Sequence, residues 1–508
     1  MLVVKPTAPK QTPQADAPGG TEPQSSESKK PGGKHRRGQD RAIPSATGSA
    51  RDRACAFIAH HAHRFPAFDS IELNTSGLEG RDAALGHAIV DAVSRRWLTL
   101  VYLIGLKCDR PWHALEPKIK GAMLVGAAQL LLLDRIPPYA AIDHAVGWVK
   151  QSVRPGAGGF VNAVLRRIAE MRGATRETQP ASALTLWADR CALPLSGNRT
   201  LELLNARLPD DEIEALAVAT GNPRQLIDCW IAQFGRDRTL SLALAGLAPA
   251  PLILNARYIG DSHVLDGLTR PHASRGFVIF DGPYESATAL FDTRPDLWAQ
   301  DPSSAGAVES LVPERGSPPI AAPRTIIDAC AGKGTKTRQL AALFPRAEIV
   351  ATDTDESRLA VLTRTFRGHP RVRVVPHAML MPDLAGWADL VVLDVPCSNT
   401  GVLARRPQAR HRFNRGSIEQ LCDIQRQIIA NSIPLLSNAK GGAILYATCS
   451  LDERENGAIA AWAVQWHGFE RRAERTVLPA GASAASKDYR DGAYSIVLAR
   501  GVDRVPIK

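Results

Sequence analysis

The feature that most constrains the fold is a series of short apolar runs in the last third of the chain, each followed by small or acidic residues. The runs are RTIIDACAG, AEIVATDTD, WADLVVLDVPC and GGAILYATCS, and segments with helical periodicity separate them. Strands that alternate with helices in this way form a parallel sheet covered by helices, and ligands bind at the carboxyl ends of its strands. We therefore predict a doubly wound, Rossmann-like α/β domain at residues 323–503.

The rest of the chain divides by composition and periodicity. Residues 1–49 are rich in Pro, Gly, Ser, Gln and Lys and poor in large apolar side chains, which is typical of a disordered tail, here a basic one. Residues 50–174 carry apolar side chains at three- and four-residue spacing, which predicts an all-α domain of about five helices. Between these domains and the Rossmann-like one we expect a helical linker region at 175–250 and a small α/β module at 251–322.

Charge and cysteine content narrow the class of protein. The 508 residues include 62 Lys+Arg and 51 Asp+Glu, and the net charge of +11 fits a protein that binds RNA or DNA as well as a merely basic enzyme. Eight cysteines without a C-x-x-C pair indicate reduced thiols in a cytoplasmic protein, with no metal site. The longest apolar stretch is too short to cross a membrane. No heptad pattern is present, so we expect a monomer.

A Gly-rich turn, from Asp328 to Thr337, joins the first apolar run to a helix. Small residues there let backbone N–H groups approach a ligand closely, although the spacing is neither that of a Walker A loop nor G-x-G-x-x-G. Asp353 follows the next strand, the usual position of an acid that accepts hydrogen bonds from ribose hydroxyls. These residues predict a nucleoside-containing cofactor, either a nicotinamide dinucleotide or S-adenosylmethionine.

Two cysteines stand at matching strand ends. Cys397 follows the third apolar run, three residues after Asp394, and Cys449 follows the fourth. A lone cysteine there would be a buried apolar residue, but two beside an acid indicate thiol chemistry. Methylation of a pyrimidine at C5 needs this set, because a thiolate must add to C6 before C5 becomes nucleophilic. An acid then stabilises the adduct and a base removes the C5 proton.

These segments resemble a known family. DVPCSNTGVLARRP and YATCSLDERENG resemble the cysteine motifs of the Sun family of bacterial 16S ribosomal RNA cytosine-5 methyltransferases, and DACAGKGTKT resembles its cofactor motif. LLLLDRIPPYAAIDHAVGWVKQ resembles the helical RNA-binding domain of the antitermination factor NusB. The resemblance implies an S-adenosylmethionine-dependent enzyme that acts on ribosomal RNA, built from an N-terminal NusB-like domain and a C-terminal Rossmann-like methyltransferase domain.

The resemblance also implies a role for each residue of the site. Cys449 corresponds to the family's nucleophile, Cys397 to the cysteine that helps to release the product, and Asp394 to the acid that contacts the target cytosine. In DNA cytosine-5 methyltransferases, by contrast, the cysteine of the Pro-Cys motif is the nucleophile. The residues expected around the cofactor are Asp328, Cys330, Ala331, Gly332, Lys333, Gly334, Thr335, Lys336, Asp353 and Asp394.

Departures from the family pattern bear on the cofactor. Residues 332–335 read Gly-Lys-Gly-Thr where the family has Ala-Pro-Gly-Gly, and His377 stands where an acid usually contacts the adenosine. The alternative function is therefore a catalytically impaired, RNA-binding ribosome-assembly factor. Arg405 and Arg406 are interpreted either as phosphate ligands or as part of a solvated loop.

Overall fold

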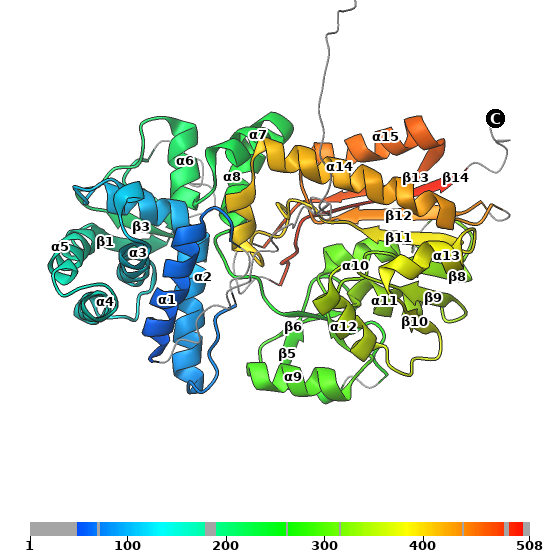
Figure 1. Ribbon diagram of the computed structural model, residues 1–508, viewed down its shortest axis with the longest axis horizontal. Coiled ribbons are helices and arrows are strands. Elements are labelled where there is room, and N and C mark those ends of the chain that lie inside the picture. Colours follow the sequence, from blue (N-terminus) through cyan, green and yellow to red (C-terminus); the bar gives the residue numbers. More distant parts are fainter. Residues whose placement is uncertain are drawn as a thin grey trace, which may run out of the picture. The chain divides into compact units, whose positions relative to one another are not determined.

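The structure is a computed structural model of the chain, shown in Figure 1. It describes residues 48–68, 72–177, 189–260, 263–313, 316–438, 441–481 and 487–500. The tail predicted at residues 1–49 lies outside the described residues, apart from its last two.

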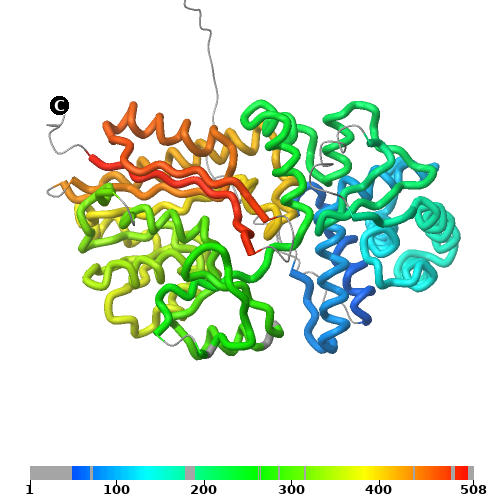
Figure 2. The backbone as a smooth tube through the Cα atoms, turned by 180° about the vertical axis from the view of Figure 1, so that it is seen from behind, coloured from blue at the N-terminus to red at the C-terminus, as the bar shows by residue number. Residues whose placement is uncertain are grey.

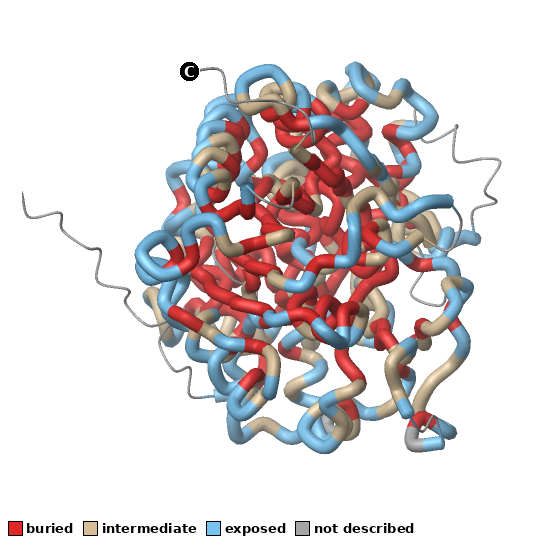
Figure 3. Tube along the Cα trace, turned by 90° about the vertical axis from the view of Figure 1, so that its right-hand side faces the viewer, coloured by how far each residue is buried: buried red, intermediate tan, exposed pale blue. Residues whose placement is uncertain are grey.

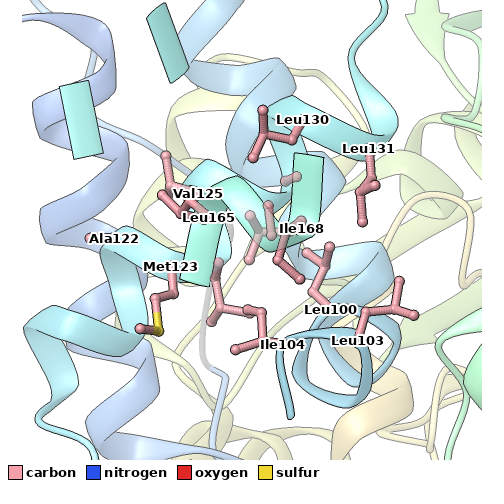
Figure 4. Close-up of a cluster of buried hydrophobic side chains, with 14 of the residues drawn as sticks. Leu100, Leu103, Ile104, Ala122, Met123, Val125, Leu130, Leu131, Leu165 and Ile168 are labelled. Carbon is pink, nitrogen blue, oxygen red and sulfur yellow. The ribbon is translucent and has the colours of Figure 1, made fainter. Parts of the chain in front are cut away.

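Five α-helices form the N-terminal domain, as predicted. The first begins where Ser49 caps it, because the Ser49 side chain accepts from the backbone N–H of Asp52 and the Asp52 carboxylate accepts from that of Ser49. The third helix is apolar on every side and runs through the middle of the core, to which Figure 4 shows the second, third and fifth helices contributing side chains. The helices are α1 (Ala50–Arg64), α2 (Gly80–Gly105), α3 (Pro117–Leu132), α4 (Pro138–Ser152) and α5 (Ala157–Ala169).

The prediction of helices and loops throughout residues 175–250 is wrong at its start. An antiparallel sheet of order β1-β3-β2 occupies this part of the chain, and alternate side chains such as Leu201 and Leu203 pack into the N-terminal core. This alternation is a strand signal that was missed. The strands are β1 (Arg172–Glu177), β2 (Ala192–Leu195) and β3 (Arg199–Leu203).

Three helices follow, and they are not a loose linker. Leu226, Trp230 and Leu242 of these helices belong to the same hydrophobic cluster as the C-terminal sheet. The apolar burial therefore fixes the segment to the C-terminal domain. The helices are α6 (Glu212–Thr220), α7 (Arg224–Phe234) and α8 (Arg236–Ala245).

A small antiparallel sheet of order β5-β6-β4-β7 lies where the α/β module is predicted. Helix α9 (Tyr284–Thr293) connects its last two strands, and α10 (Pro302–Glu309) leads toward the C-terminal sheet. The strands are β4 (Ile253–Asn255), β5 (Thr269–Pro271), β6 (Phe277–Phe280) and β7 (Trp298–Ala299). The exact domain boundaries given above stay predictions.

The C-terminal domain is built on a seven-stranded sheet of order β10-β9-β8-β11-β12-β14-β13. The first five strands are parallel, as predicted. β14 runs antiparallel to both of its neighbours, so the complete sheet is mixed; Figure 2 shows it in red beside β12. The strands are β8 (Thr325–Asp328), β9 (Glu348–Ala351), β10 (Val372–Val374), β11 (Leu390–Asp394), β12 (Ala443–Thr448), β13 (Phe469–Val477) and β14 (Ala493–Arg500).

Helices cover both faces of this sheet. Val391 and Leu393 of β11 pack on the side of α14 and α15, whereas Leu390 and Val392 pack on the side of α10, α11 and α12. Figure 3 shows the buried interior that results. The covering helices that follow α10 are α11 (Thr335–Leu343), α12 (Glu356–Thr365), α13 (Leu380–Leu384), α14 (Arg415–Ser432) and α15 (Gly457–His467). Within the described part of the chain, no helix has the length and apolar character needed to cross a membrane.

Candidate active site

A cavity of about 1400 Å³ lies at the carboxyl ends of the parallel strands. This is the edge of the sheet at which the strand pattern places a ligand. Of the residues predicted for the site, all except Asp328 and Gly334 line the cavity. Those that line it are Cys330, Ala331, Gly332, Lys333, Thr335, Lys336, Asp353, Asp394, Cys397 and Cys449.

The Gly-rich loop turns sharply between β8 and α11. Gly332 and Gly334 have left-handed backbone conformations, with φ of 59° and 92°. A Cβ atom on Gly334 would lie 2.6 Å from the ring of Phe366, so both conformation and space require glycine there. Nothing lies within 4 Å of a Cβ atom on Gly332, which leaves the cavity side of the loop open.

Asp353 lies just beyond the end of β9 and its carboxylate faces the loop. The backbone N–H of Gly332 donates to Asp353 Oδ2 at 2.9 Å, and Arg358 forms an ion pair with Oδ1 at 3.1 Å. This acid therefore stands at the rim of the cavity, at the position predicted for a ribose contact.

Asp328, in contrast, supports the loop from inside. Its side chain is fully buried, and Thr337 Oγ1 donates to its Oδ2 at 2.6 Å. Burial raises the pKa of this carboxyl to about 7. Asp328 is the last residue of β8, and its side chain points into the core. It therefore holds the start of α11 and does not contact the cavity.

The raised pKa makes the stability of the fold depend on pH. An ordinary Asp in the unfolded chain ionises above about pH 4, whereas Asp328 in the folded protein keeps its proton until about pH 7. The carboxyl therefore destabilises the fold progressively as the pH rises from about 4 to 7. We expect Asp328→Asn to be more stable than the wild type, and the difference in their free energies of unfolding to grow by roughly 2–3 kcal/mol from pH 5 to pH 8. Urea unfolding at both pH values measures this gain, and a difference that does not change with pH would contradict it.

An ion pair between the buried Lys336 and the partly exposed Asp394 joins the loop to the first cysteine motif. Lys336 Nζ lies 2.8 Å from Asp394 Oδ2 and also donates to Ser304 Oγ at 3.2 Å. Burial alone would lower the pKa of Lys336, but the Asp394 carboxylate outweighs it, and the net shift is upward. Lys336 therefore remains a cation beside Asp394, and Cys449 also contributes to its electrostatic surroundings.

The two cysteines meet in the cavity. Cys397 Sγ lies 3.3 Å from Cys449 Sγ, although the residues are 52 positions apart in the sequence. They come together because β11 and β12 are neighbouring parallel strands, so the loops that follow them leave the sheet at the same edge. The contact with Cys449, and then burial, raise the pKa of Cys397 well above its ordinary value.

Side chains next to the cysteines complete the site, and sequence reasoning missed them. Asn399 Oδ1 accepts from Cys449 Sγ at 3.3 Å and from Arg406 at 2.9 Å. The carboxylate of Glu455 accepts from both Ser398 and Ser450. All of these residues lie inside the two cysteine motifs, so proximity in sequence was the available signal.

Arg405 and Arg406, interpreted above as phosphate ligands or as part of a solvated loop, have different surroundings. Arg405 forms ion pairs with Asp491 at 2.5 Å and Asp301 at 3.2 Å, so it is a structural cation. Arg406 is exposed at the cavity and donates to Asn399 Oδ1, and its role as a phosphate ligand stays a prediction. His377 is likewise exposed and lines the cavity.

The residues around the cavity fit a nucleoside cofactor. The open loop at Gly332, the acid at the rim and the volume of the cavity meet the needs of a molecule of that size. Together with the Rossmann-like sheet, this site defines the class: an enzyme that uses a nucleoside-containing cofactor, joined to a helical domain.

Comparison with known proteins identifies the families. Residues 320–489 match the family described as 16S rRNA methyltransferase RsmB/F, and residues 49–170 match the NusB family. These matches make the C-terminal domain similar to S-adenosylmethionine-dependent rRNA methyltransferases and the helical domain similar to NusB, which confirms the resemblance to the Sun family.

Curated relatives match about three quarters of the chain. Ribosomal RNA small subunit methyltransferase B of Xanthomonas campestris is 28% identical over 393 residues, which cover 74% of this chain and 78% of that protein. The protein of the same name from Escherichia coli is 28% identical over 385 residues, with coverage of 74% and 80%. The crystal structure of PH0851 is 18% identical, with a TM-score of 0.65 over 89% of this chain and 99% of that chain, and supports the fold.

Proposed function

We propose that this protein methylates C5 of a cytosine in ribosomal RNA of the small subunit, with Cys449 as the nucleophile. The names of the relatives support ribosomal RNA as the substrate. The observation that carries the choice of C5 is the pair of thiols 3.3 Å apart in the cavity that also contains the Gly-rich loop. Other positions on a base do not need two thiols.

The loop and the acid at the rim would hold the cofactor. Gly332 and its neighbours present an open backbone, and Asp353 offers its carboxylate to ribose hydroxyls. When bound, S-adenosylmethionine supplies the methyl group as an electrophile. Lys336 holds the Asp394 carboxylate by an ion pair at 2.8 Å, so that its oxygens can accept hydrogen bonds from the target base.

The two thiols have different roles in the covalent steps. The Cys449 thiolate adds to C6, and the electron pair of the C5–C6 double bond makes C5 the nucleophile that takes the methyl group. The Cys397 thiolate then removes the proton from C5, the double bond reforms, and the C6–sulfur bond breaks with its electron pair returning to Cys449. Because the two sulfur atoms lie 3.3 Å apart, Cys397 can reach the C5 proton of a base that is bonded to Cys449.

Tritium release tests the choice of C5. Small-subunit RNA labelled with tritium at C5 of cytosine is incubated with the protein and S-adenosylmethionine. We expect tritium to enter water in step with methyl transfer, because each transfer replaces the C5 hydrogen. Methyl transfer without tritium release would contradict C5 as the site.

The alternative, an RNA-binding assembly factor, has its own signature. It would bind small-subunit RNA but show no methyl transfer. Calorimetry with S-adenosylmethionine separates the two functions, because the proposed enzyme binds the cofactor and the assembly factor shows no heat of binding at millimolar concentration.

A further inference from the structure

One buried carboxylate connects the two cysteine loops. Glu455 lies in the short helical turn Glu453–Glu455 between β12 and α15, and its side chain is fully buried. Its Oε1 accepts from the backbone N–H of Ser398 at 2.9 Å and from Gln425 Nε2 at 3.0 Å. Its Oε2 accepts from the hydroxyls of Ser398 and Ser450. All four bonds run toward the carboxylate.

The two serines are the residues that directly follow the two cysteines. Ser398 follows Cys397 at the end of β11, and Ser450 follows Cys449 at the end of β12. Their hydroxyls also lie 3.0 Å from each other, so the three side chains form one closed set. A single side chain thus fixes the backbone beside both sulfur atoms.

We propose that Glu455 is a positioning residue that sets the separation of the two thiols for the methyl-transfer cycle. This inference rests on the proposed function. Glu455 lies outside the residues that line the cavity, so it acts only through Ser398 and Ser450.

The chemistry of the contacts explains why a carboxylate stands there. A carboxylate has two acceptor oxygens and no donor, which matches four donors. A glutamine of the same shape offers one acceptor oxygen, and its NH₂ group would face donors on the other side. Burying a charge costs free energy unless hydrogen bonds compensate. A carboxylate at this position therefore indicates that it serves the geometry of the two cysteine loops and not the stability of the fold.

The test compares Glu455→Gln with Asp452→Asn. Asp452 is a buried carboxylate in the same segment, but its side chain pairs with Arg454. Only its backbone N–H contacts a serine, donating to Ser450 Oγ at 2.9 Å, and Asp452→Asn leaves that N–H in place. Phenylarsine oxide reports the thiol separation, because its arsenic forms bonds to two adjacent sulfurs, and its oxygen leaves with the two thiol protons as one molecule of water. Mass mapping after maleimide treatment shows which cysteines it protects. This measurement needs neither RNA nor cofactor.

In the wild type we expect the arsenical to protect Cys397 and Cys449 together. In Glu455→Gln, the rate of this capture and kcat should each fall, kcat by about 10²-fold, while KM for RNA changes by less than about twofold. Asp452→Asn should keep both rates within about threefold of the wild type. Ser450→Ala removes the hydrogen bond from the Ser450 hydroxyl to Glu455 and should also lower the capture rate and kcat. It replaces Glu455→Gln as the test if that variant does not fold.

Unchanged capture and kcat in the Glu455 or Ser450 variants would overturn the proposal. An equal loss in Asp452→Asn would also overturn it, because the effect would then reflect general stability. Failure of the proposed function gives a different result: a wild type that captures the arsenical but transfers no methyl group.

Discussion

Cys449→Ala is expected to abolish methyl transfer, with a loss of about 10⁴-fold or more, because no other group can form the bond to C6. Cys397 lies 3.3 Å away but follows a different strand, β11 instead of β12, and it is not expected to replace the nucleophile. The measurement is transfer of labelled methyl groups to small-subunit RNA under single-turnover conditions.

Cys422→Ala is the matched control for this loss. Cys422 is also buried, but it lies on α14, contacts the backbone of Arg454 and does not line the cavity. Its replacement should cost about 1 kcal/mol of stability and leave the rate of transfer nearly unchanged. A Cys449→Ala protein that retains a tenth of the wild-type rate would exclude Cys449 as the nucleophile.

Lys336→Met is expected to have the second-largest effect, a loss of about 10²- to 10³-fold in kcat/KM. The substitution keeps the length of the side chain but removes the charge that holds Asp394 at 2.8 Å. Lys336 is buried whereas Asp394 is partly exposed at the cavity, so the substitution would leave Asp394 without its ion-pair partner and without a fixed orientation.

Lys333→Met is the control, since Lys333 belongs to the same loop and lines the cavity but is exposed. Its effect should stay within about tenfold, because an exposed charge is screened by solvent. Steady-state methyl transfer compares the two variants. Equal losses of kcat/KM would show that methyl transfer does not depend specifically on the Lys336–Asp394 ion pair.

The arrangement of the thiols could be predicted because it follows from strand topology. Parallel strands present their carboxyl ends at one edge, so residues after two apolar runs must meet if the strands are neighbours. β11 and β12 are neighbours, and Cys397, Cys449 and Asp394 line one cavity as that reasoning requires.

Other features depend on where a side chain turns, and the strand pattern does not contain this information. Asp328 stands in the cofactor motif, yet its side chain points into the core. Glu455 reaches the serines only because the chain forms a short helical turn after Ser450. The apolar pattern does not reveal β13, because β13 is an edge strand with few buried side chains.

Covalent trapping tests the central claim most directly, namely that the two thiols have different roles. Cys397→Ala and Cys449→Ala proteins are each incubated with small-subunit RNA and S-adenosylmethionine and then run on a denaturing gel. The Cys397→Ala protein should accumulate a protein–RNA band, because the adduct forms but is not released, and the Cys449→Ala protein should give none. A band in Cys449→Ala, or no band in Cys397→Ala, would contradict the assignment of Cys449 as nucleophile and Cys397 as the releasing base.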